Sequence, residues 1–410
     1  MNLDILFLTK LFPKENEQEI LKKIKTNNQA AANTFQWNLI NGLDANECGI
    51  IKIINYLPID SYPNGYEERL IKRFVFHHTD MYNTEDINVG FNNTRFIKQI
   101  FNYRPIQKEV KEWVYSKEGK DKYLISYTAN LNFLKVIKYV KKIDPNIKTC
   151  CIIADLPQYL TASDLKGVKK IHSDYVTKKS ENLYKYVDKF VLLTKQMAEK
   201  VGDNPQYMVM EGIYSYNNIE NFKEFDFLKN KKYVLYSGTL NYKFGIKKLI
   251  DAFSLINDDI YLVVCGAGPA ATELKTSKNN RIIFLGELPR EKVLYIQKNA
   301  TVLVNPRENI EEFTKYSFPS KLMEYLASGV PVVLYKLDGI PDEYDEFFNY
   351  VNDDSVKSLA SKIIEICNLT LEERIKIGEK GKDFVYNNKN YIIQTKKLLQ
   401  FLINKKYQNK

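Results

Sequence analysis

NPRENIEEFTKYSFPSKLMEYLASGVPVV, residues 305–333, is the stretch that indicates the fold most directly. We expect an apolar strand just before it, over 301–304, and another at its end, over 330–334. A polar loop and a short helix lie between them. Pro319 begins this helix and Gly329 ends it, which are the usual positions of these residues at helix ends. A strand, a helix and a second strand in this order are typical of a parallel α/β sheet.

The same stretch carries side chains suited to an anionic ligand rich in hydroxyl groups. Arg307 offers a fixed fork of donors that fits a diphosphate. Lys321 lies in the first turn of the helix, where its charge opposes the helix dipole, so a bound anion nearby would explain it. The helix start, with Ser320, can also hold phosphate. Glu324 can accept hydrogen bonds from sugar or ribose hydroxyls. The alternative is that the lysine and the glutamate are solvated surface residues.

Short apolar runs alternate with helical patterns along all 410 residues. Strands separated by helices predict parallel sheets covered on both faces. The predicted strands are 4–8, 51–56, 73–76, 123–127, 149–153, 190–193, 207–210, 233–236, 260–265, 282–285, 301–304 and 330–334. The fold class is therefore α/β, with two Rossmann-like doubly wound domains facing a cleft. In such sheets ligands bind beyond the carboxyl ends of the strands.

A polar stretch without a clear period divides the chain into two parts. We expect an N-terminal acceptor-binding Rossmann-like domain over 1–213 and a linker region over 214–231. A C-terminal nucleotide-sugar-binding Rossmann-like domain would follow over 232–390. Residues 391–410 are predicted to form a basic C-terminal helix that packs back on the N-terminal domain.

Composition narrows the class of protein. The formal net charge is +10, which suits an anionic substrate or an anionic membrane surface. No recognised nucleic-acid motif is present, so we expect no nucleic acid partner. No run of apolar residues is long enough to span a membrane, and the start of the chain is expected to be a strand and not a signal peptide. The five cysteines show no metal-ligand spacing, which favours a reducing cytoplasm without disulfides or structural zinc.

Two further turns follow predicted strands in the second half. In YSGTLNYKFG, residues 236–245, Gly238 lets the backbone approach a ligand, Thr239 offers a hydroxyl, and Lys243 can reach a phosphate. In CGAGP, residues 265–269, Gly266 follows a strand, but the third glycine of a nicotinamide fingerprint is missing. Ordinary strand-to-helix turns remain the alternative for both.

The first half offers weaker candidates. Asp155 follows the strand 149–153, so its carboxylate would face the expected cleft as a candidate catalytic group, unless it only caps a turn. Asn33 and Gln36 lie beside aromatic residues and suit a sugar acceptor, although a core helix explains the segment equally well. His172 could be a functional polar group or an exposed histidine. It lies among lysines, over 166–179, that suit acidic headgroups, an acceptor diphosphate or simply solvent.

Taken together, the motifs resemble those of a retaining glycosyltransferase of the GT-B fold, similar to family 4 and to its bacterial surface polysaccharide branch. The resemblance rests on YSGTL, FGIKKLIDAF, LVVCGAGP, IIFLGELPREKVLYIQKNATVLVNPR and FTKYSFPSKLMEYLASGVPVV, in that order over about 233–335.

The resemblance implies roles for individual residues. Glu324 matches the second glutamate of the E-x7-E signature, which binds the ribose of the nucleotide. Tyr316 stands where the first glutamate is expected, and a related role for Glu312 is a guess. Gly238, Thr239 and Gly266 would contact the donor. Arg307, Lys243 and Lys321 would supply positive charge.

The resemblance also implies an activity. A sugar would pass from a nucleotide-diphosphate donor to a polysaccharide, lipid-linked or glycoconjugate acceptor, with retention and without a metal or other cofactor. The enzyme would be cytoplasmic or peripheral on the inner membrane face. Two alternatives remain open: a non-catalytic GT-B partner subunit of another glycosyltransferase, and a sugar-nucleotide epimerase.

Overall fold

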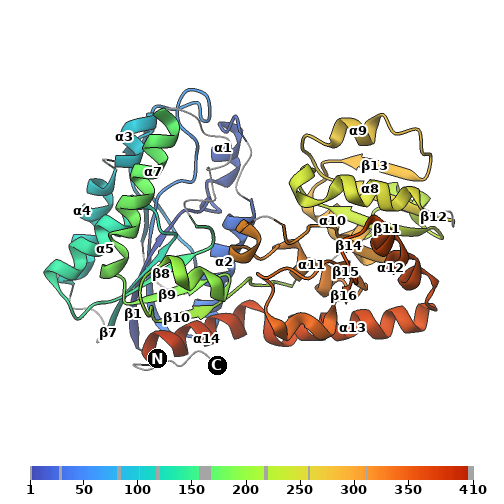
Figure 1. The fold of residues 1–410 in the computed structure, drawn as a ribbon. Coiled ribbons are helices and arrows are strands. Elements are labelled where there is room, and N and C mark those ends of the chain that lie inside the picture. The colour runs from blue at the N-terminus through green and yellow to red at the C-terminus, as the bar shows by residue number, and fades with distance from the viewer. Residues whose placement is uncertain are drawn as a thin grey trace. The chain divides into compact units, whose positions relative to one another are not determined.

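The computed structural model describes residues 2–26, 30–80, 85–100, 102–116, 121–156, 168–216, 220–256, 259–310 and 312–404. The chain forms two compact units (Figure 1). The first comprises Met1–Ile213 together with Tyr391–Lys410, and the second comprises Tyr214–Asn390.

The first unit is built on a sheet with the strand order β10-β9-β8-β7-β1-β2-β5-β4. All described pairs in this sheet are parallel except β4 with β5. The central strand β1 is buried along its whole length because both faces of the sheet are covered. The strands are β1 (Leu3–Thr9), β2 (Gly49–Asn55), β4 (Phe74–Phe76), β5 (Asp86–Asn88), β7 (Asp121–Tyr127), β8 (Lys148–Ile153), β9 (Lys189–Leu192) and β10 (Tyr207–Val209).

Helices cover the faces of this sheet, and a short antiparallel pair lies outside it, formed by β3 (Leu70–Ile71) and β6 (Phe91–Asn92). The helices are α1 (Glu17–Lys22), α2 (Ala30–Ala45), α3 (Arg95–Ile100), α4 (Tyr103–Tyr115), α5 (Leu131–Ile143), α7 (Val168–Glu181), η1 (Tyr184–Tyr186), η2 (Lys195–Lys200) and α14 (Tyr391–Ile403). The last of these, α14, packs against α2.

The second unit is built on a parallel sheet with the order β13-β12-β11-β14-β15-β16. Its strands are β11 (Lys232–Ser237), β12 (Ile260–Cys265), β13 (Ile282–Gly286), β14 (Val302–Asn305), β15 (Val332–Leu334) and β16 (Asn349–Tyr350). Its helices are η3 (Lys223–Leu228), η4 (Tyr242–Phe244), α8 (Ile246–Ser254), α9 (Ala271–Lys275), α10 (Arg290–Lys298), η5 (Glu312–Tyr316), α11 (Lys321–Ala327), η6 (Asp342–Phe347), α12 (Val356–Asn368) and α13 (Leu371–Asn388).

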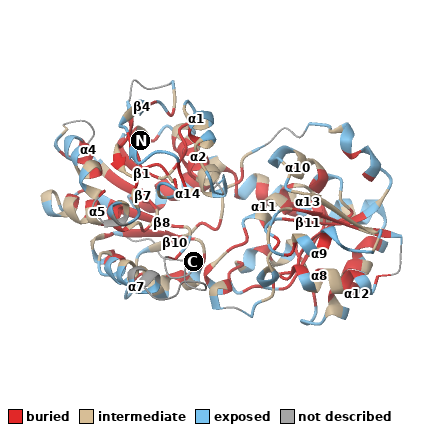
Figure 2. Ribbon diagram, turned by 90° about the horizontal axis from the view of Figure 1, so that it is seen from above, coloured by how far each residue is buried: buried red, intermediate tan, exposed pale blue. Residues whose placement is uncertain are grey.

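Each sheet forms the buried middle layer of its unit, as Figure 2 shows in red, and the helices keep an exposed outer side. In the second unit a separate hydrophobic cluster lies on each face of the sheet. Leu235 and Leu303 belong to one cluster, whereas their neighbours Val234 and Val302 belong to the other. This alternation follows from the opposite directions of successive side chains along a strand.

The α/β class with two Rossmann-like units is confirmed, and each predicted strand overlaps an observed one. The strand predicted over 330–334 begins only at Val332, and no prediction was made for the short strands β3, β5, β6 and β16. The expected linker over 214–231 is part of the second unit, because η3 lies within it and Phe225 and Leu228 are buried in that unit's core. Residues 405–410 of the predicted basic end lie outside the described residues.

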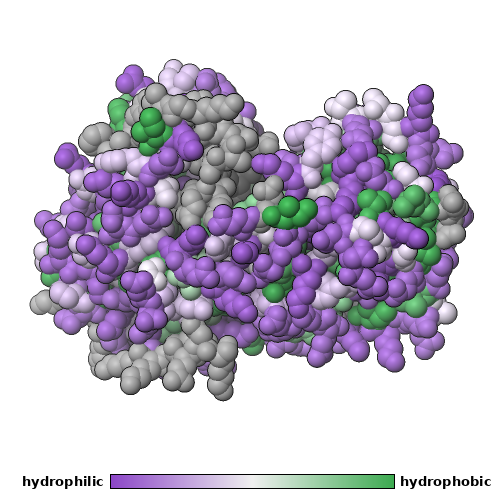
Figure 3. Space-filling view, in the orientation of Figure 1, coloured by the Kyte–Doolittle hydropathy of each residue, from purple (hydrophilic) through white to green (hydrophobic). Residues whose placement is uncertain are grey.

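The visible face in Figure 3 is mostly hydrophilic, with small scattered apolar patches. Within the described part of the chain, every helix is too short or too polar to cross a membrane. All five cysteines are buried and free.

Candidate anion site

Three loops meet at the carboxyl ends of β11, β12 and β14, at one edge of the second unit's sheet. The amide of Gly238 donates to the carbonyl oxygen of Cys265, at 3.0 Å. A β-carbon on Gly266, whose φ is 138°, would lie 1.9 Å from the carbonyl oxygen of Gly238. One on Gly245 would lie 2.0 Å from the carbonyl oxygen of Pro306. The absence of side chains on these glycines therefore allows the three loops to touch.

Arg307 lies in the loop after β14 and is only 6% exposed. Its guanidinium stacks on Phe313, 4.5 Å from the ring centre, and its Nη1 donates to the hydroxyl of Ser317 at 3.1 Å. Nε and Nη2 are buried and have no hydrogen-bond partner. These two groups lie on one edge of the guanidinium and form the fork that matches two oxygens of a phosphate. Burial lowers the pKa of Arg307 to about 10.

Lys321 is the first residue of α11, and its ammonium lies over the ring of Tyr236, 3.8 Å from the centre. The same ammonium would lie 3.5 Å from a β-carbon on Gly238. Burial, with a smaller effect from the charge of Arg307, lowers the pKa of Lys321 to about 7. The Tyr236 hydroxyl donates to the carbonyl oxygen of Thr239, at 2.9 Å, which fixes the ring under the ammonium.

The two cations repel each other in a desolvated place, and no carboxylate among the described residues pairs with either. Buried charge without a counterion is unfavourable, and the removal of one partner of a buried pair typically costs about 3–5 kcal/mol. A bound anion would remove this penalty. The arrangement of Arg307 and Lys321 therefore suits a phosphate or diphosphate group.

Glu324 lies one helical turn further along α11 and is partly exposed. Arg290, at the start of α10, donates from Nε at 2.9 Å and from Nη2 at 2.7 Å to the same carboxylate oxygen, Oε1. The second oxygen of this carboxylate, Oε2, can accept hydrogen bonds from hydroxyl groups.

The other predicted residues of this unit are exposed around the loops. Gly238 and Thr239 are exposed, as are Ser320 at the start of α11 and Lys243 in η4. Gly238 lies beside the Lys321 ammonium, and Gly266 lies against Gly238. Among the described residues, no contact holds the Lys243 side chain at this place. Tyr316, which stands at the position of the first signature glutamate, is buried. Glu312 lies on η5 and is exposed.

The candidates of the first unit have contacts of a different kind. Gln36 is fully buried; its Oε1 accepts from the amide of Lys10 and its Nε2 donates to the Lys10 carbonyl oxygen, both at 2.7 Å. The Oδ1 of Asn33 accepts from the amide of Phe12 at 2.8 Å. Both amides therefore hold the loop after β1, and their role in acceptor binding stays a prediction.

Asp155 follows β8 and is exposed, although nearby protein desolvates its carboxyl group enough to raise its pKa. Of the segment ADLPQYL, residues 157–160 lie outside the described part. The backbone of His172 belongs to α7, and its side chain lies outside the described part.

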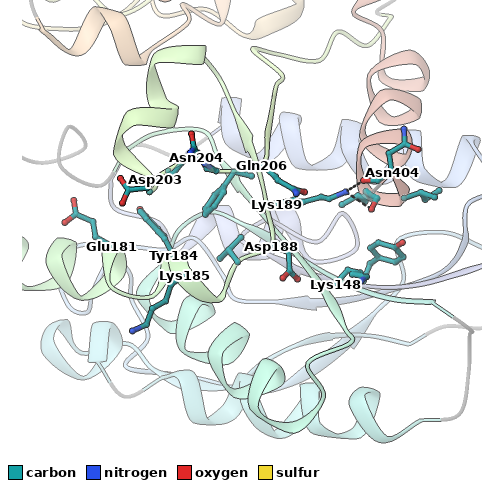
Figure 4. Close-up of a pocket in the computed structure, with 18 of the residues that line it drawn as sticks. Lys148, Glu181, Tyr184, Lys185, Asp188, Lys189, Asp203, Asn204, Gln206 and Asn404 are labelled. Atoms are coloured by element: carbon teal, nitrogen blue, oxygen red, sulfur yellow. Dashed lines mark hydrogen bonds between the residues drawn. The ribbon is translucent and has the colours of Figure 1, made fainter. Parts of the chain in front are cut away.

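A cavity of about 880 Å³ lies in the first unit, at the amino ends of the strands β7, β8 and β9 (Figure 4). Lys189 on its wall donates to the carbonyl oxygens of Phe401, Leu402 and Asn404, at 2.5, 3.0 and 2.6 Å. These contacts fix the end of α14, so this lysine is structural. In the part of the chain that the structure describes, no cluster of three His, Cys, Asp or Glu side chains could hold a metal ion.

Two residues of this site, Arg290 and Tyr236, are not indicated by the sequence patterns. Arg290 pairs with a residue 34 positions away, which periodicity cannot indicate. Its place directly after a predicted strand and at the start of a helix was the available signal. The pattern predicts Tyr236 only as a strand residue, because its hydroxyl and ring contacts depend on how α11 folds onto the sheet.

This chain is similar to known proteins both in sequence and in fold. Residues 217–384, which lie within the second unit, match the protein family described as Glycosyl transferases group 1. A search of curated protein sequences found no match.

Several solved structures share the fold of the whole chain at low sequence identity. Sucrose-phosphate synthase from Thermosynechococcus elongatus has a TM-score of 0.64 at 16% identity and covers 98% of this chain and 99% of its own. An α,α-trehalose-phosphate synthase (UDP-forming) from Burkholderia xenovorans, in complex with glucose-6-phosphate, has a TM-score of 0.64 at 9% identity, with coverages of 98% and 100%. HepE from Anabaena, in complex with UDP, has a TM-score of 0.62 at 14% identity, with coverages of 98% and 99%. The chain therefore has the GT-B fold.

Proposed function

We propose, on the premise that a group 1 glycosyltransferase domain lies within a chain of GT-B fold, that the protein is a retaining glycosyltransferase. It moves a sugar from a nucleotide-diphosphate donor to a polysaccharide, lipid-linked or glycoconjugate acceptor. One observation carries the proposal: the free Nε and Nη2 fork of Arg307 beside the ammonium of Lys321, with no carboxylate partner for either among the described residues.

The chemistry follows from the leaving group. As the bond from the sugar to the diphosphate breaks, negative charge grows on the diphosphate. The fork of Arg307 and the ammonium of Lys321 stabilise that charge, and Lys243 adds a third cation from its exposed position. Donors that are fixed in advance stabilise the transition state more than the ground state, and each is commonly worth about 2.7–4 kcal/mol. We infer that these cations take the place of a metal ion and that no cofactor takes part.

Glu324 binds the ribose hydroxyls of the donor in this proposal. Arg290 holds one of its oxygens, so the carboxylate is oriented before the donor arrives. Gly238, Thr239, Gly266 and Ser320 surround the phosphates. The HepE structure contains UDP, which makes uridine nucleotides the first donors to test.

The acceptor is assigned to the first unit, where Asp155 would contact the sugar or the acceptor, and Asn33, Gln36 and His172 would contribute weaker contacts. We also propose a cytoplasmic enzyme that associates with anionic membrane surfaces. The net charge of +10 and the exposed Ile171 and Tyr175 on α7 support this association. Nucleic acid is not proposed as a partner.

The test is a transfer assay. The purified protein is incubated with UDP-, GDP- and ADP-sugars and with an extract of lipid-linked and polymeric acceptors, and release of the nucleoside diphosphate is followed. Arg307→Lys keeps the charge but loses the fork, so we expect kcat to fall about 10²–10³-fold. Glu324→Ala should weaken donor binding about tenfold or more, because a hydrogen bond to a charged group contributes about 1.5–3 kcal/mol.

Lys278→Ala is the matched control, because it removes an exposed charge of the same unit and should leave the rate unchanged. Absence of binding to any sugar nucleotide would refute the proposal. Donor binding with unchanged turnover in Arg307→Lys, and with a stoichiometric partner protein, would point to the non-catalytic subunit. Interconversion of sugar nucleotides without an acceptor would identify an epimerase.

A further inference from the structure

The helix α11 carries two residues of the candidate anion site, Lys321 and Glu324, but it is too short to hold its own position. It has seven residues, and the side chain of Ser320 at its start makes no capping hydrogen bond. Helices of this length are unstable alone and depend on tertiary contacts. Whatever fixes α11 against the sheet therefore also fixes the two binding groups.

Tyr325 supplies such a contact from the buried side of α11. Its side chain is 0% exposed, so it acts on a ligand only through other residues. Its hydroxyl accepts from the amide of Ser237, the last residue of β11, at 3.0 Å, and donates to the carbonyl oxygen of Ser237 at 3.3 Å. The Ser237 hydroxyl donates to the same oxygen atom at 3.3 Å. One side-chain oxygen thus joins α11 to the end of β11.

A second helix is tied to the same serine. Gln297 on α10 is 1% exposed, and its Nε2 donates to the Ser237 hydroxyl at 3.0 Å. Arg290 lies seven residues earlier, on the same side of α10, and holds the carboxylate of Glu324. The donors run in one direction, from Gln297 through Ser237 to Tyr325, and such chains of hydrogen bonds strengthen each other. The helices α10 and α11 therefore meet β11 at one buried polar junction.

This junction lies directly beside the cation of α11. Lys321 and Tyr325 are four residues apart and share one side of the helix, and the Lys321 ammonium lies 5.9 Å from the centre of the Tyr325 ring. Ser237 directly precedes Gly238, and a β-carbon on Gly238 would lie 3.5 Å from the same ammonium. Any slip of α11 along β11 would move the ammonium relative to the glycine loop. A binding site that is loose by about 1 Å loses much of its effect.

We propose that Tyr325 is a positioning residue whose hydroxyl holds α11 against the end of β11 and so sets the place of Lys321 and Glu324 before the donor binds. The inference rests on the proposed function, in which these two residues bind the diphosphate and the ribose. A phenylalanine would fill the same space in the core but would leave α11 without its bonds to the strand.

The test compares two buried tyrosines of the same hydrophobic cluster, each changed to phenylalanine in the full chain. Tyr325→Phe removes the hydroxyl that bonds to β11. Tyr233→Phe is the matched control, because Tyr233 is 1% exposed and its hydroxyl donates to the carbonyl oxygen of Ile296 on α10, at 2.7 Å. Each variant loses a buried tyrosine hydroxyl, so the melting temperatures should fall by a similar few degrees.

Hydrogen exchange of the unliganded protein, followed by mass spectrometry, reports whether α11 is held. The amides of residues 321–327 should exchange at least about tenfold faster in Tyr325→Phe than in Tyr233→Phe. A general loss of stability would speed exchange equally in both variants, so the difference between them measures the local contact.

Calorimetry with one nucleotide reports whether this position matters for binding. The probe is whichever of UDP, GDP and ADP gives the largest thermal shift with wild type. Tyr325→Phe should bind it at least about fivefold more weakly, and Tyr233→Phe within about twofold of wild type. Burial lowers the pKa of Lys321 to about 7. A looser α11 exposes this ammonium and raises its pKa, so the loss of affinity with rising pH should begin at a higher pH in Tyr325→Phe than in wild type.

Equal exchange of α11 in the two variants would overturn the inference. So would wild-type nucleotide affinity in Tyr325→Phe despite faster exchange, because α11 would then be held without effect on the site. The donor assignment is tested separately by Arg307→Met, which should weaken nucleotide binding without changing the exchange of α11. If wild type binds none of the three nucleotides, the donor assignment fails, and the exchange rates still decide whether the Tyr325 hydroxyl holds the helix.

Discussion

Single side chains decide what the second unit can bind. Arg307 is held by two different contacts, a stack on Phe313 and a hydrogen bond to Ser317, and both leave its Nε and Nη2 edge free. Lys321 is held over the ring of Tyr236. The protein thus fixes two cations in advance, and its described residues supply no counterion, which is the condition for strong stabilisation of an incoming negative charge.

The pKa of Lys321 gives a pH dependence that can be measured. The pKa is lowered to about 7 in the unliganded protein, and a bound diphosphate would raise it because opposite charges favour the protonated form. Binding therefore takes up a proton above pH 7. Affinity for a nucleoside diphosphate should be nearly constant between pH 6.5 and about 7, and should fall by up to about tenfold per pH unit above that.

Calorimetry between pH 6.5 and 9, in buffers of different ionisation enthalpy, reports both the affinity and the proton uptake. Lys321→Met lacks the titrating group, so its affinity should be lower and nearly independent of pH in this range. The same slope in the variant and in wild type would show that another group is responsible.

The side chains of the anion site are positioned by the loops after β11, β12 and β14, which lie in close contact with one another. The loop after β12 reaches the loop after β11 only because position 266 carries no side chain. Gly266→Ala places a β-carbon against a carbonyl oxygen at a φ of 138°, so we expect a loss of more than about 3 kcal/mol in the free energy of unfolding. Denaturant unfolding measures this loss.

Gly286→Ala is the matched control. This glycine has a φ of 71°, but nothing lies within 4 Å of an added β-carbon. The substitution should therefore cost only the backbone strain, about 1–2 kcal/mol. If the two variants lose the same stability, the contact between the loops is not what Gly266 provides.

The sequence was sufficient to predict the elements and part of the site. Alternating apolar runs and helical patterns are local properties, so most strands of both sheets could be identified, and with them the edge at which Gly238, Gly266 and Arg307 lie. The short strands β5 and β16 carry too few residues to show a pattern. The pairing of Arg290 with Glu324 and the position of Tyr236 under Lys321 arise only from packing between distant segments. The hydrogen bonds of Gln36 to the backbone of Lys10 likewise join distant segments, so a local pattern does not indicate them.

At the scale of the whole molecule, the last helix, α14, completes the first unit. It begins at Tyr391, which is 178 residues after Ile213 in the sequence. Its buried side chains Leu398, Leu399, Phe401 and Leu402 each contribute about 1.5–3 kcal/mol of apolar burial. Their sum is comparable to the net stability of a typical domain, about 5–15 kcal/mol. A chain that ends at Asn390 should therefore lose the folded first unit.

Limited proteolysis and near-ultraviolet circular dichroism would detect this loss. Lys189→Met keeps α14 and removes only the three bonds to its end, so its first unit should remain folded and be less stable. A first unit that resists protease to the same degree with and without α14 would contradict the assignment of this helix to the first unit's core.

A crystal structure with a nucleoside diphosphate bound tests the central claim most directly. The nucleotide is the one among UDP, GDP and ADP that gives the largest thermal shift. We predict that two oxygens of its diphosphate lie about 2.7–3.2 Å from Nε and Nη2 of Arg307, beside the Lys321 ammonium. A diphosphate bound elsewhere, with the Arg307 fork still empty, would contradict the account.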